Sequence, residues 1–220
     1  MQSQLFYAIV AHKEGDALKH NYQSDTDSAI AALGGPVKPT LLLHSCCGPC
    51  SSYVLEYLTQ YFDVTILFYG PNIQPEAEYE KRLYYQREVL KHIPAKIMEC
   101  DYDGAAFEAA ARGLEDEPEG GARCTACFRL RLEETAKRAA RGGFGWYCTT
   151  LTVSPHKDAE RINRLGAELG IKYGVKWLPS DFKKRNGYLR SIRLAEEYGL
   201  YRQDWCGCEY SHLLPISRIE

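Results

Sequence analysis

The feature that most constrains the fold is the alternation of short, largely apolar runs with longer segments of helical character. The first run, 40–44, is too short for a stable helix and is typical of a strand buried on both faces. Strands that alternate with helices form parallel sheets with helices on both faces, so the sequence predicts an α/β fold. The expected strands are 40–44, 64–69, 96–100, 146–151 and a short one at 173–177, and the expected helices are 51–61, 75–92, 125–140, 158–169 and 191–198.

The length of 220 residues suits a single domain. Residues 1–39 are predicted to be an N-terminal extension, in part disordered, because Glu14–Asp27 is polar and glycine and proline punctuate the end; Ala29–Leu33 suits one helical turn. Residues 40–220 are predicted to form the α/β catalytic domain, with a basic, cysteine-containing C-terminal part. The sequence has neither an apolar run of the ~18 residues that a membrane span requires nor a secretory signal. We therefore expect a cytoplasmic protein with no membrane partner.

The chain contains nine cysteines, a number that is uneven and is high for a protein of a reducing compartment. Under those conditions clustered cysteines indicate metal or redox chemistry more often than structural disulfides. Cys46, Cys47 and Cys50 directly follow the first strand, and Cys124 and Cys127 begin a later helix. Ligands of parallel α/β sheets bind beyond the carboxyl ends of the strands, and helix N-termini stabilise thiolates. The two groups are therefore expected to converge into one metal site.

The spacing leaves the identity of the metal open. Four thiolates satisfy either a tetrahedral zinc or a four-iron, four-sulfur (4Fe–4S) cluster. The fifth thiolate favours an iron–sulfur cluster beside another metal, because a structural zinc leaves it unexplained. The alternative is a set of unrelated buried thiols, which is how we interpret Cys100 and Cys148 in their predicted strands.

Cys206-Gly207-Cys208 is a separate motif near the end of the chain. Two thiols that flank a flexible residue can close into a small, strained disulfide, and strained disulfides suit a redox pair. Inert thiols and further metal ligands are the alternatives. His156, after the fourth strand, is a candidate general acid or substrate contact, with a surface or capping histidine as the equally weighted alternative.

The net charge of −2 hides an uneven distribution. Segment 123–202 has 17 Lys or Arg and 8 Asp or Glu, a net charge of +9, whereas the remainder has a net charge of −11. Basic residues interleaved with tyrosines in this segment favour single-stranded RNA as a partner, and solvated basic helix faces are the alternative. The candidate RNA contacts are Lys183, Lys184, Arg185, Arg190 and Arg202.

In combination these motifs resemble one family, the QueH-type epoxyqueuosine reductases, over about 40–211; residues 1–39 fall outside the resemblance. The ordered set is highly specific. It consists of 44–50 (HSCCGPC), 69–73 (YGPNI), Glu78-Tyr79 with Arg82, 101–103 (DYD), 123–132 (RCTACFRLRL), 149–151 (TTL) with 154–156 (SPH), 181–184 (DFKK), and 200–203 (LYRQ) with Cys206-Gly207-Cys208.

The resemblance implies a Rossmann-like α/β core and the last step of queuosine synthesis in tRNA. In that step the epoxide of epoxyqueuosine, at the wobble position of the anticodon, is reduced to an alkene. The resemblance further implies a 4Fe–4S cluster next to an additional mononuclear iron, no cobalamin, a tRNA anticodon stem-loop as partner and an external electron donor that the sequence does not identify.

Residue roles carry over from the family onto matching positions. Cys46, Cys47, Cys124 and Cys127 are the implied cluster ligands, Cys50 is the implied ligand of the extra iron, and Cys206 and Cys208 form the implied redox disulfide. The reaction also needs a proton donor, for which the candidates are His156, Tyr201 and Asp101.

Three other functions compete with this interpretation. A zinc-stabilised RNA-binding module has no redox activity. An ATP-dependent tRNA-thiolating enzyme has a similar core, but a cysteine motif occupies the position of its phosphate loop. A thiol–disulfide oxidoreductase built on C-x-x-C leaves the three cysteines at 46–50 unexplained.

Overall fold

The computed structural model describes residues 20–212. A five-stranded sheet forms its centre, with β1 (Thr40–Ser45), β2 (Asp63–Phe68), β3 (Lys96–Glu99), β4 (Trp146–Thr149) and β5 (Lys176–Trp177). All neighbouring strands pair in parallel, in the order β3-β2-β1-β4-β5. This confirms the predicted α/β fold with a parallel sheet.

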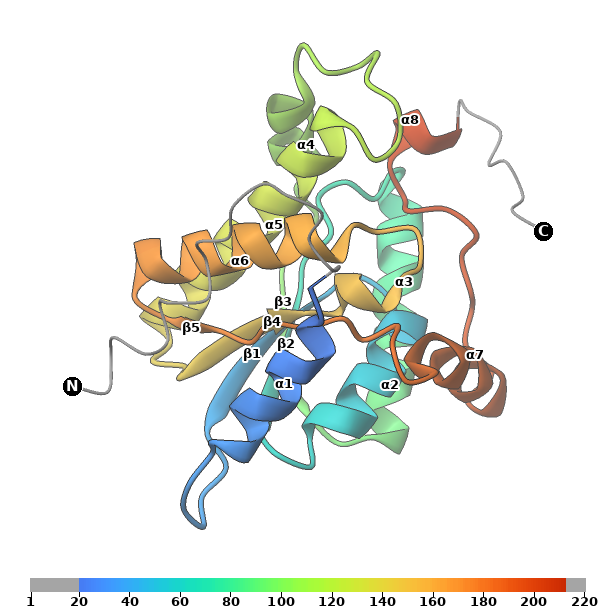
Figure 1. Cartoon of the computed structure of the whole chain (residues 1–220). Helices are drawn as coiled ribbons and strands as arrows, with labels where there is room; N and C mark the ends of the chain where they lie inside the picture. The colour runs from blue at the N-terminus through green and yellow to red at the C-terminus, as the bar shows by residue number, and fades with distance from the viewer. Residues whose placement is uncertain (1–19, 213–220) are drawn as a thin grey trace.

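Helices cover both faces of the sheet (Figure 1). They are α1 (Tyr22–Ala31), α2 (Gly48–Leu58), α3 (Glu76–His92), α4 (Gly104–Ala111), α5 (Ala122–Arg141), η1 (Thr150–Val153), α6 (Ala159–Tyr173), α7 (Gly187–Glu197) and α8 (Glu209–His212). Figure 1 shows α5 and α6 on one side of the sheet and α1 and α2 on the other. Among residues 20–212 no helix is both long and apolar enough to cross a membrane.

Alternate residues of β1 divide the core into two layers. Leu41 and Leu43 pack in the layer that contains α2 and α3, whereas Leu42 packs against residues of α5 and α6. Successive side chains of a strand point to opposite faces, so His44 faces α5 and Ser45 faces α3. Every residue of β1 after Thr40 is buried, which explains why the apolar residues Leu41, Leu42 and Leu43 are consecutive and do not alternate with polar ones.

The structure differs from the sequence predictions mainly at short elements. Helix α1 is longer than the single turn expected at Ala29–Leu33, and the strand predicted at 146–151 ends at Thr149, directly before η1 begins at Thr150. Helix α1 packs on the domain, because Ala29 joins the core and Thr26 donates a 2.7 Å hydrogen bond to the Pro179 carbonyl. Residues 1–19 of the predicted extension lie outside the described residues.

Candidate metal and redox site

The sheet reverses its winding at β1, which lies between β2 and β4. In open parallel sheets, the ligand crevice lies outside the carboxyl ends of the strands at such a point. Cys46 and Cys47 follow β1 there, and Cys47 is the N-cap of α2. A Cβ on Gly48 would lie 2.6 Å from the Tyr85 carbonyl oxygen, so glycine permits the close approach of α2 to α3 that fixes this turn.

Cys46, Cys47 and Cys50 form the first thiol group. Cys46 and Cys47 are buried, Cys50 is partly exposed, and the three side chains are linked by sulfur hydrogen bonds. The hydrogen bond with Cys47 raises the pKa of Cys46, an effect that burial reinforces. The hydrogen bond with Cys47 lowers the pKa of Cys50. Cys50 is therefore the most readily ionised thiol of this group.

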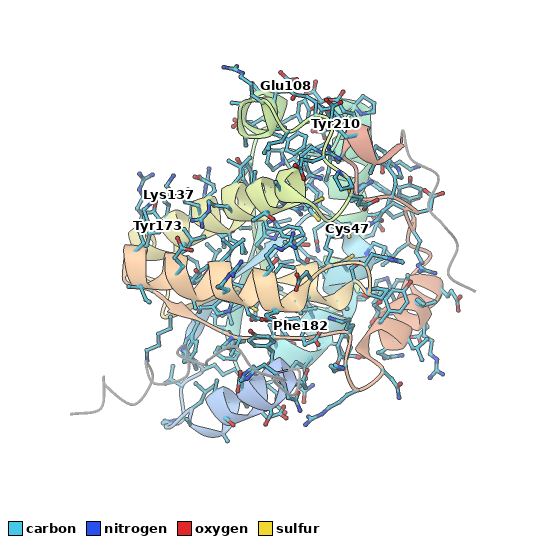
Figure 2. All side chains as sticks on the ribbon, turned by 45° about the horizontal axis from the view of Figure 1, so that its top comes forward. Cys47, Glu108, Lys137, Tyr173, Phe182 and Tyr210 are labelled. Atoms are coloured by element: carbon cyan, nitrogen blue, oxygen red, sulfur yellow. The ribbon has the colours of Figure 1, made fainter. Side chains whose placement is uncertain are left out.

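Cys124 and Cys127 form the second thiol group, in the first two turns of α5. The Gly120 backbone N–H donates a 3.2 Å hydrogen bond to Cys124 Sγ. Burial raises the pKa of Cys127 to about 11 and also raises that of Cys124. In Figure 2, Lys137 and Tyr173 mark one end of the helix pair α5 and α6, and Cys47 lies toward the other end.

Arg131 connects the two thiol groups. Its Nη1 lies 3.9 Å from Cys127 Sγ, one helical turn away, and its guanidinium also hydrogen-bonds Cys46. Its Nε lies 3.2 Å from Nε2 of His44, the residue that leads into the first thiol group. The two groups, which are about eighty positions apart in the sequence, therefore share one buried arginine.

The segment Trp205–Cys208 is held against the same edge of the sheet by polar contacts. Arg82 Nη1 donates a 3.1 Å hydrogen bond to the Cys206 carbonyl, and Asn72 Nδ2 donates to the same oxygen at 3.3 Å. The Gln74 backbone N–H donates to the Gly207 carbonyl at 2.9 Å. Cys206 interacts electrostatically with Cys124 and Cys127, and Cys208 packs with Cys127. The C-x-C motif therefore joins the site.

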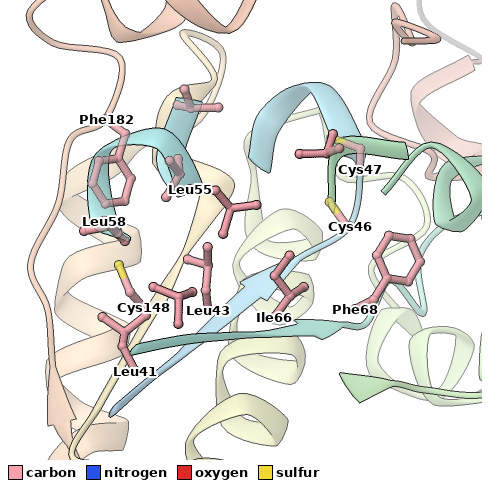
Figure 3. Packing of buried hydrophobic residues seen from close by; sticks show 14 of the residues in the cluster. Leu41, Leu43, Cys46, Cys47, Leu55, Leu58, Ile66, Phe68, Cys148 and Phe182 are labelled. Atoms are coloured by element: carbon pink, nitrogen blue, oxygen red, sulfur yellow. The ribbon is translucent and has the colours of Figure 1, made fainter. Parts of the chain in front are cut away.

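Seven of the nine cysteines thus meet at one edge of the sheet, and all nine are free thiols in this structure. The other two lie elsewhere. Cys148 is fully buried among core residues, and Figure 3 shows it close to Leu41 and well apart from Cys46 and Cys47. Cys100 directly follows β3 and is partly buried. The prediction that Cys148 is a core residue is confirmed.

The donor set suits an iron–sulfur group. Sulfur is the ligand atom that such clusters use, and a 4Fe–4S cluster takes four thiolates. One buried hydrogen-bond donor at this site, Arg131 Nη2, has no acceptor in the structure. It is free to donate to a bound anionic group. Within residues 20–212, no three His, Cys, Asp or Glu side chains are already arranged around a single ion. A four-iron cluster binds each thiolate through a different iron, so its ligands surround a larger volume than one ion does.

The three candidate proton donors occupy different positions. His156 is exposed, in the loop after η1. Tyr201 is half-buried; its hydroxyl donates to Glu78 at 3.3 Å, and Lys81 Nζ lies 3.4 Å from its ring centroid. Asp101 is exposed and follows the edge strand β3, two strands away from β1. Tyr201 has the strongest link to the site, because Glu78 also pairs with Arg82.

The five candidate RNA-binding residues fall into two groups. Lys183 pairs with Asp181, Arg185 with Asp27, and Arg190 with both Glu56 and Glu197. Lys184 and Arg202 are exposed and form no ion pair within the described part of the chain. The loop that carries Lys184 lies against η1, since the Lys183 backbone N–H donates to the Thr152 carbonyl. This loop is therefore close to the carboxyl edge of the sheet.

Sequence reasoning gave no role to Arg131 or Lys157. Arg131 lies four positions after Cys127 in a helix, a spacing that places both side chains on one face and could have indicated the contact. Lys157 is half-buried, and its charge lowers the pKa of both Cys50 and Cys206, after the larger effects of their sulfur hydrogen bonds. No local pattern indicates that a lysine beside His156 faces two distant cysteine motifs.

A family model described as "Epoxyqueuosine reductase QueH" matches residues 41–213. The Epoxyqueuosine reductase QueH of Streptococcus pyogenes is 46% identical over 181 residues, covering 80% of this chain and 71% of the relative. The protein of that name from Thermotoga maritima is 37% identical over 180 residues, covering 79% of this chain and 91% of the relative.

Two solved structures share the fold at low sequence identity. The U34-tRNA thiolase NcsA from Methanococcus maripaludis, with its 4Fe–4S cluster, has a TM-score of 0.53 and 12% identity over 86% of this chain and 67% of that chain. The predicted subunit of a tRNA methyltransferase from Methanocaldococcus jannaschii has a TM-score of 0.50 and 15% identity over 72% of this chain and 74% of that one.

The parallel sheet with thiols gathered at its carboxyl edge defines a cysteine-rich α/β protein of the Rossmann-like class. Among such proteins, the family match and the identities of the relatives decide the assignment. The chain belongs to the epoxyqueuosine reductase QueH family, whose members are oxidoreductases.

Proposed function

We propose that this site removes the epoxide oxygen of epoxyqueuosine in the anticodon of tRNA. The observation that carries the proposal is the convergence of three cysteine motifs at the ligand-binding edge of the sheet. Family membership supplies the substrate class, because the relatives carry the name of that activity. The modified base has to leave the stacked anticodon to reach buried thiols, as in other enzymes that act on a base.

The chemistry has a simple balance. Removal of the epoxide oxygen breaks two C–O bonds, forms a C=C bond, consumes two electrons and two protons and releases water. Cys206 and Cys208 can provide the two electrons and two protons, because oxidation of their two thiols to a disulfide releases that number of each. An external reductant must then return the pair to the dithiol state.

Cys46, Cys47, Cys124 and Cys127 would hold a 4Fe–4S cluster, and Cys50 would hold an adjacent iron. When bound, these groups supply one-electron transfer and a Lewis acid for the departing oxygen. Tyr201 is the best-placed proton donor of the three candidates, because it is half-buried and contacts Glu78. Lys157 supplies a positive charge beside Cys50 and Cys206.

Metal analysis of the protein purified without oxygen tests the proposal. About four sulfides and about five irons per chain are expected, the number that one cluster and one additional iron require. Cys124→Ala should lose most of the iron and sulfide and all turnover of epoxyqueuosine tRNA. Cys100→Ser, a thiol outside the site, is the matched control and should keep both.

Other outcomes would change the assignment. One zinc per chain without sulfide, persisting after cluster reconstitution, would identify a zinc-stabilised RNA-binding module instead. Full turnover by Cys206→Ser would show that the C-x-C motif is not the redox pair, whatever the metal content.

A further inference from the structure

Arg131 is a buried cation without a carboxylate partner. The residue is only 2% exposed, and it contacts His44 of β1 from the face of α5 that packs on the sheet. In the part of the chain from 20 to 212, no Asp or Glu forms an ion pair with it. A buried charge with no counter-charge is strongly destabilising, so the position of Arg131 requires an anion nearby.

The contacts that Arg131 makes do not supply that anion. The ring of His44 that faces Arg131 Nε is buried, and an imidazole carries no negative charge in either of its protonation states. The same ring nitrogen lies 2.9 Å from the Tyr69 carbonyl oxygen, and a single nitrogen cannot donate to Tyr69 and accept from Arg131 at once. Nη2 of Arg131 is buried without a partner.

Arg82, on α3, is a second buried arginine near the site, and it has a carboxylate partner. It is equally buried, at 2% exposure, but Glu78 lies 2.7 Å from its Nε. Its Nη1 and Nη2 donate to the Cys206 and Trp205 carbonyls. The fold therefore provides a carboxylate for Arg82 and only sulfur and an imidazole for Arg131.

Cys46 and Cys127 are the groups that can become anionic beside Arg131. Cys127 Sγ lies 3.9 Å from Arg131 Nη1, and the guanidinium also contacts Cys46. Thiolates that bind a metal are deprotonated, and a positive charge next to them offsets their negative charge.

We propose that Arg131 is a positioning residue that neutralises the thiolates of Cys46 and Cys127 and the anionic iron–sulfur group they hold. The inference rests on the cluster assigned under the proposed function. A fixed positive charge stabilises the reduced, more negative state of such a group more than the oxidised state. Arg131 therefore favours cluster retention and raises the reduction potential.

The test compares Arg131→Gln and Arg131→Lys with the matched control Arg129→Gln. Arg129 lies two positions earlier on α5, is exposed and pairs with Glu168, so its loss removes the same charge at the surface. Each protein is reconstituted without oxygen, and iron, sulfide and the midpoint potential in a redox titration are measured. Arg131→Gln should lose most of the iron and sulfide, and the cluster that remains should have a lower potential. Arg131→Lys should fall between this variant and wild type, and Arg129→Gln should match wild type.

The thermal midpoint of the metal-free protein separates this role from a purely structural one. In the metal-free protein, Arg131→Gln removes a positive charge that has no partner. In the loaded protein, it removes a positive charge that neutralises the thiolates and the bound group. It should therefore lower the thermal midpoint of the loaded protein more than that of the metal-free protein, and circular dichroism shows whether the variant folds. Arg131→Lys keeps the charge and provides the comparison if the Gln variant does not fold.

Two results would overturn the inference in distinguishable ways. If wild type takes up no iron and sulfide, both the proposed function and the role of Arg131 are wrong. If wild type holds the cluster and Arg131→Gln keeps the same iron, sulfide and potential, the proposed function stands and only the role of Arg131 is wrong.

Discussion

Cys206 and Cys208 are separated by one residue, yet their thiols differ in reactivity. The hydrogen bond from Cys208 lowers the pKa of Cys206 well below its ordinary value, and Lys157 adds to the effect. The same hydrogen bond raises the pKa of Cys208. Because the thiolate is the nucleophile in thiol–disulfide exchange, Cys206 is expected to be the attacking thiol and Cys208 its partner.

Alkylation of the reduced, metal-free protein tests this difference. With limiting iodoacetamide at pH 7, Cys206 should be labelled well before Cys208, and before Cys148, whose pKa burial raises to about 12. Lys157→Gln should slow the labelling of Cys206 because it removes a charge that stabilises the thiolate. Peptide mass spectrometry gives the rates.

Lys172→Gln is the control for this experiment, since Lys172 lies at the other end of α6 from the site. Equal labelling of Cys206 and Cys208, or faster labelling of Cys208, would contradict the assignment. If Cys206 is alkylated at the same rate in Lys157→Gln as in wild type, Lys157 does not stabilise the Cys206 thiolate.

At the scale of elements, the segment Trp205–Cys208 depends on its fit against the β2–α3 connection. Gly207 has φ of +98°, a conformation that side chains other than glycine rarely adopt. A Cβ there would lie 2.9 Å from Ile73 Cγ1 and 3.1 Å from Arg82 Nη1. The glycine between the cysteines therefore gives both the backbone conformation and the space that keep the C-x-C motif in place.

Gly207→Ala should displace this segment and lower the free energy of unfolding by about 1–3 kcal/mol in a urea titration of the metal-free protein. Turnover should fall by about tenfold or more, because the redox pair moves relative to the other thiols. Gly199→Ala is the matched control: its φ is +62°, but nothing lies within 4 Å of a Cβ. It should cost only about 1–2 kcal/mol and keep turnover. Equal turnover in the two variants would mean that the packing of Gly207 is not needed.

At the scale of the whole molecule, the two edges of the parallel sheet carry different groups. The thiols, η1 and the loop with Lys184 lie at the carboxyl edge of the sheet, while Lys38 and Lys96 precede or begin strands at the amino edge. Part of the positive charge of segment 123–202 is already neutralised by ion pairs with Asp27, Glu56 and Asp181. An anticodon stem-loop that reaches the thiols is thus expected to meet Lys184 and Arg202.

Lys184→Glu combined with Arg202→Glu should weaken tRNA binding and reduce the slope of log affinity against log salt by about 2, one for each phosphate contact. Lys38→Glu combined with Lys96→Glu makes the same change in net charge at the opposite edge and should leave the slope unchanged. Filter binding or anisotropy at several salt concentrations gives the slopes. Equal slopes for the two double variants would show that the interface lies elsewhere.

Much of the fold could be predicted because the sheet is buried on both faces. Each central strand must then be a short apolar run, and runs such as 40–44 and 64–69 stand out from the amphipathic helices around them. Helix α4 escaped prediction because Gly104–Ala111 is short and small-residue-rich and has no clear amphipathic period. Helix α1 escaped it because this polar helix is stabilised by the contacts of Thr26 and Asp27 with distant residues.

The sequence by itself determined the layered α/β fold, the family and the thiols of the site, because short apolar runs and cysteine spacing are local properties of the chain. The tertiary structure decided which charges face those thiols. Arg131 lies beside Cys46 only because α5 packs on β1. The charge of Lys157 acts on Cys206 only because contacts with Asn72, Gln74 and Arg82 hold the last segment at the same edge of the sheet. The structure likewise decided that Arg185 and Arg190 are paired with carboxylates, while Lys184 is exposed and forms no ion pair with the residues from 20 to 212. Electrostatic partners depend on distance in space, which the spacing of residues along a chain does not specify.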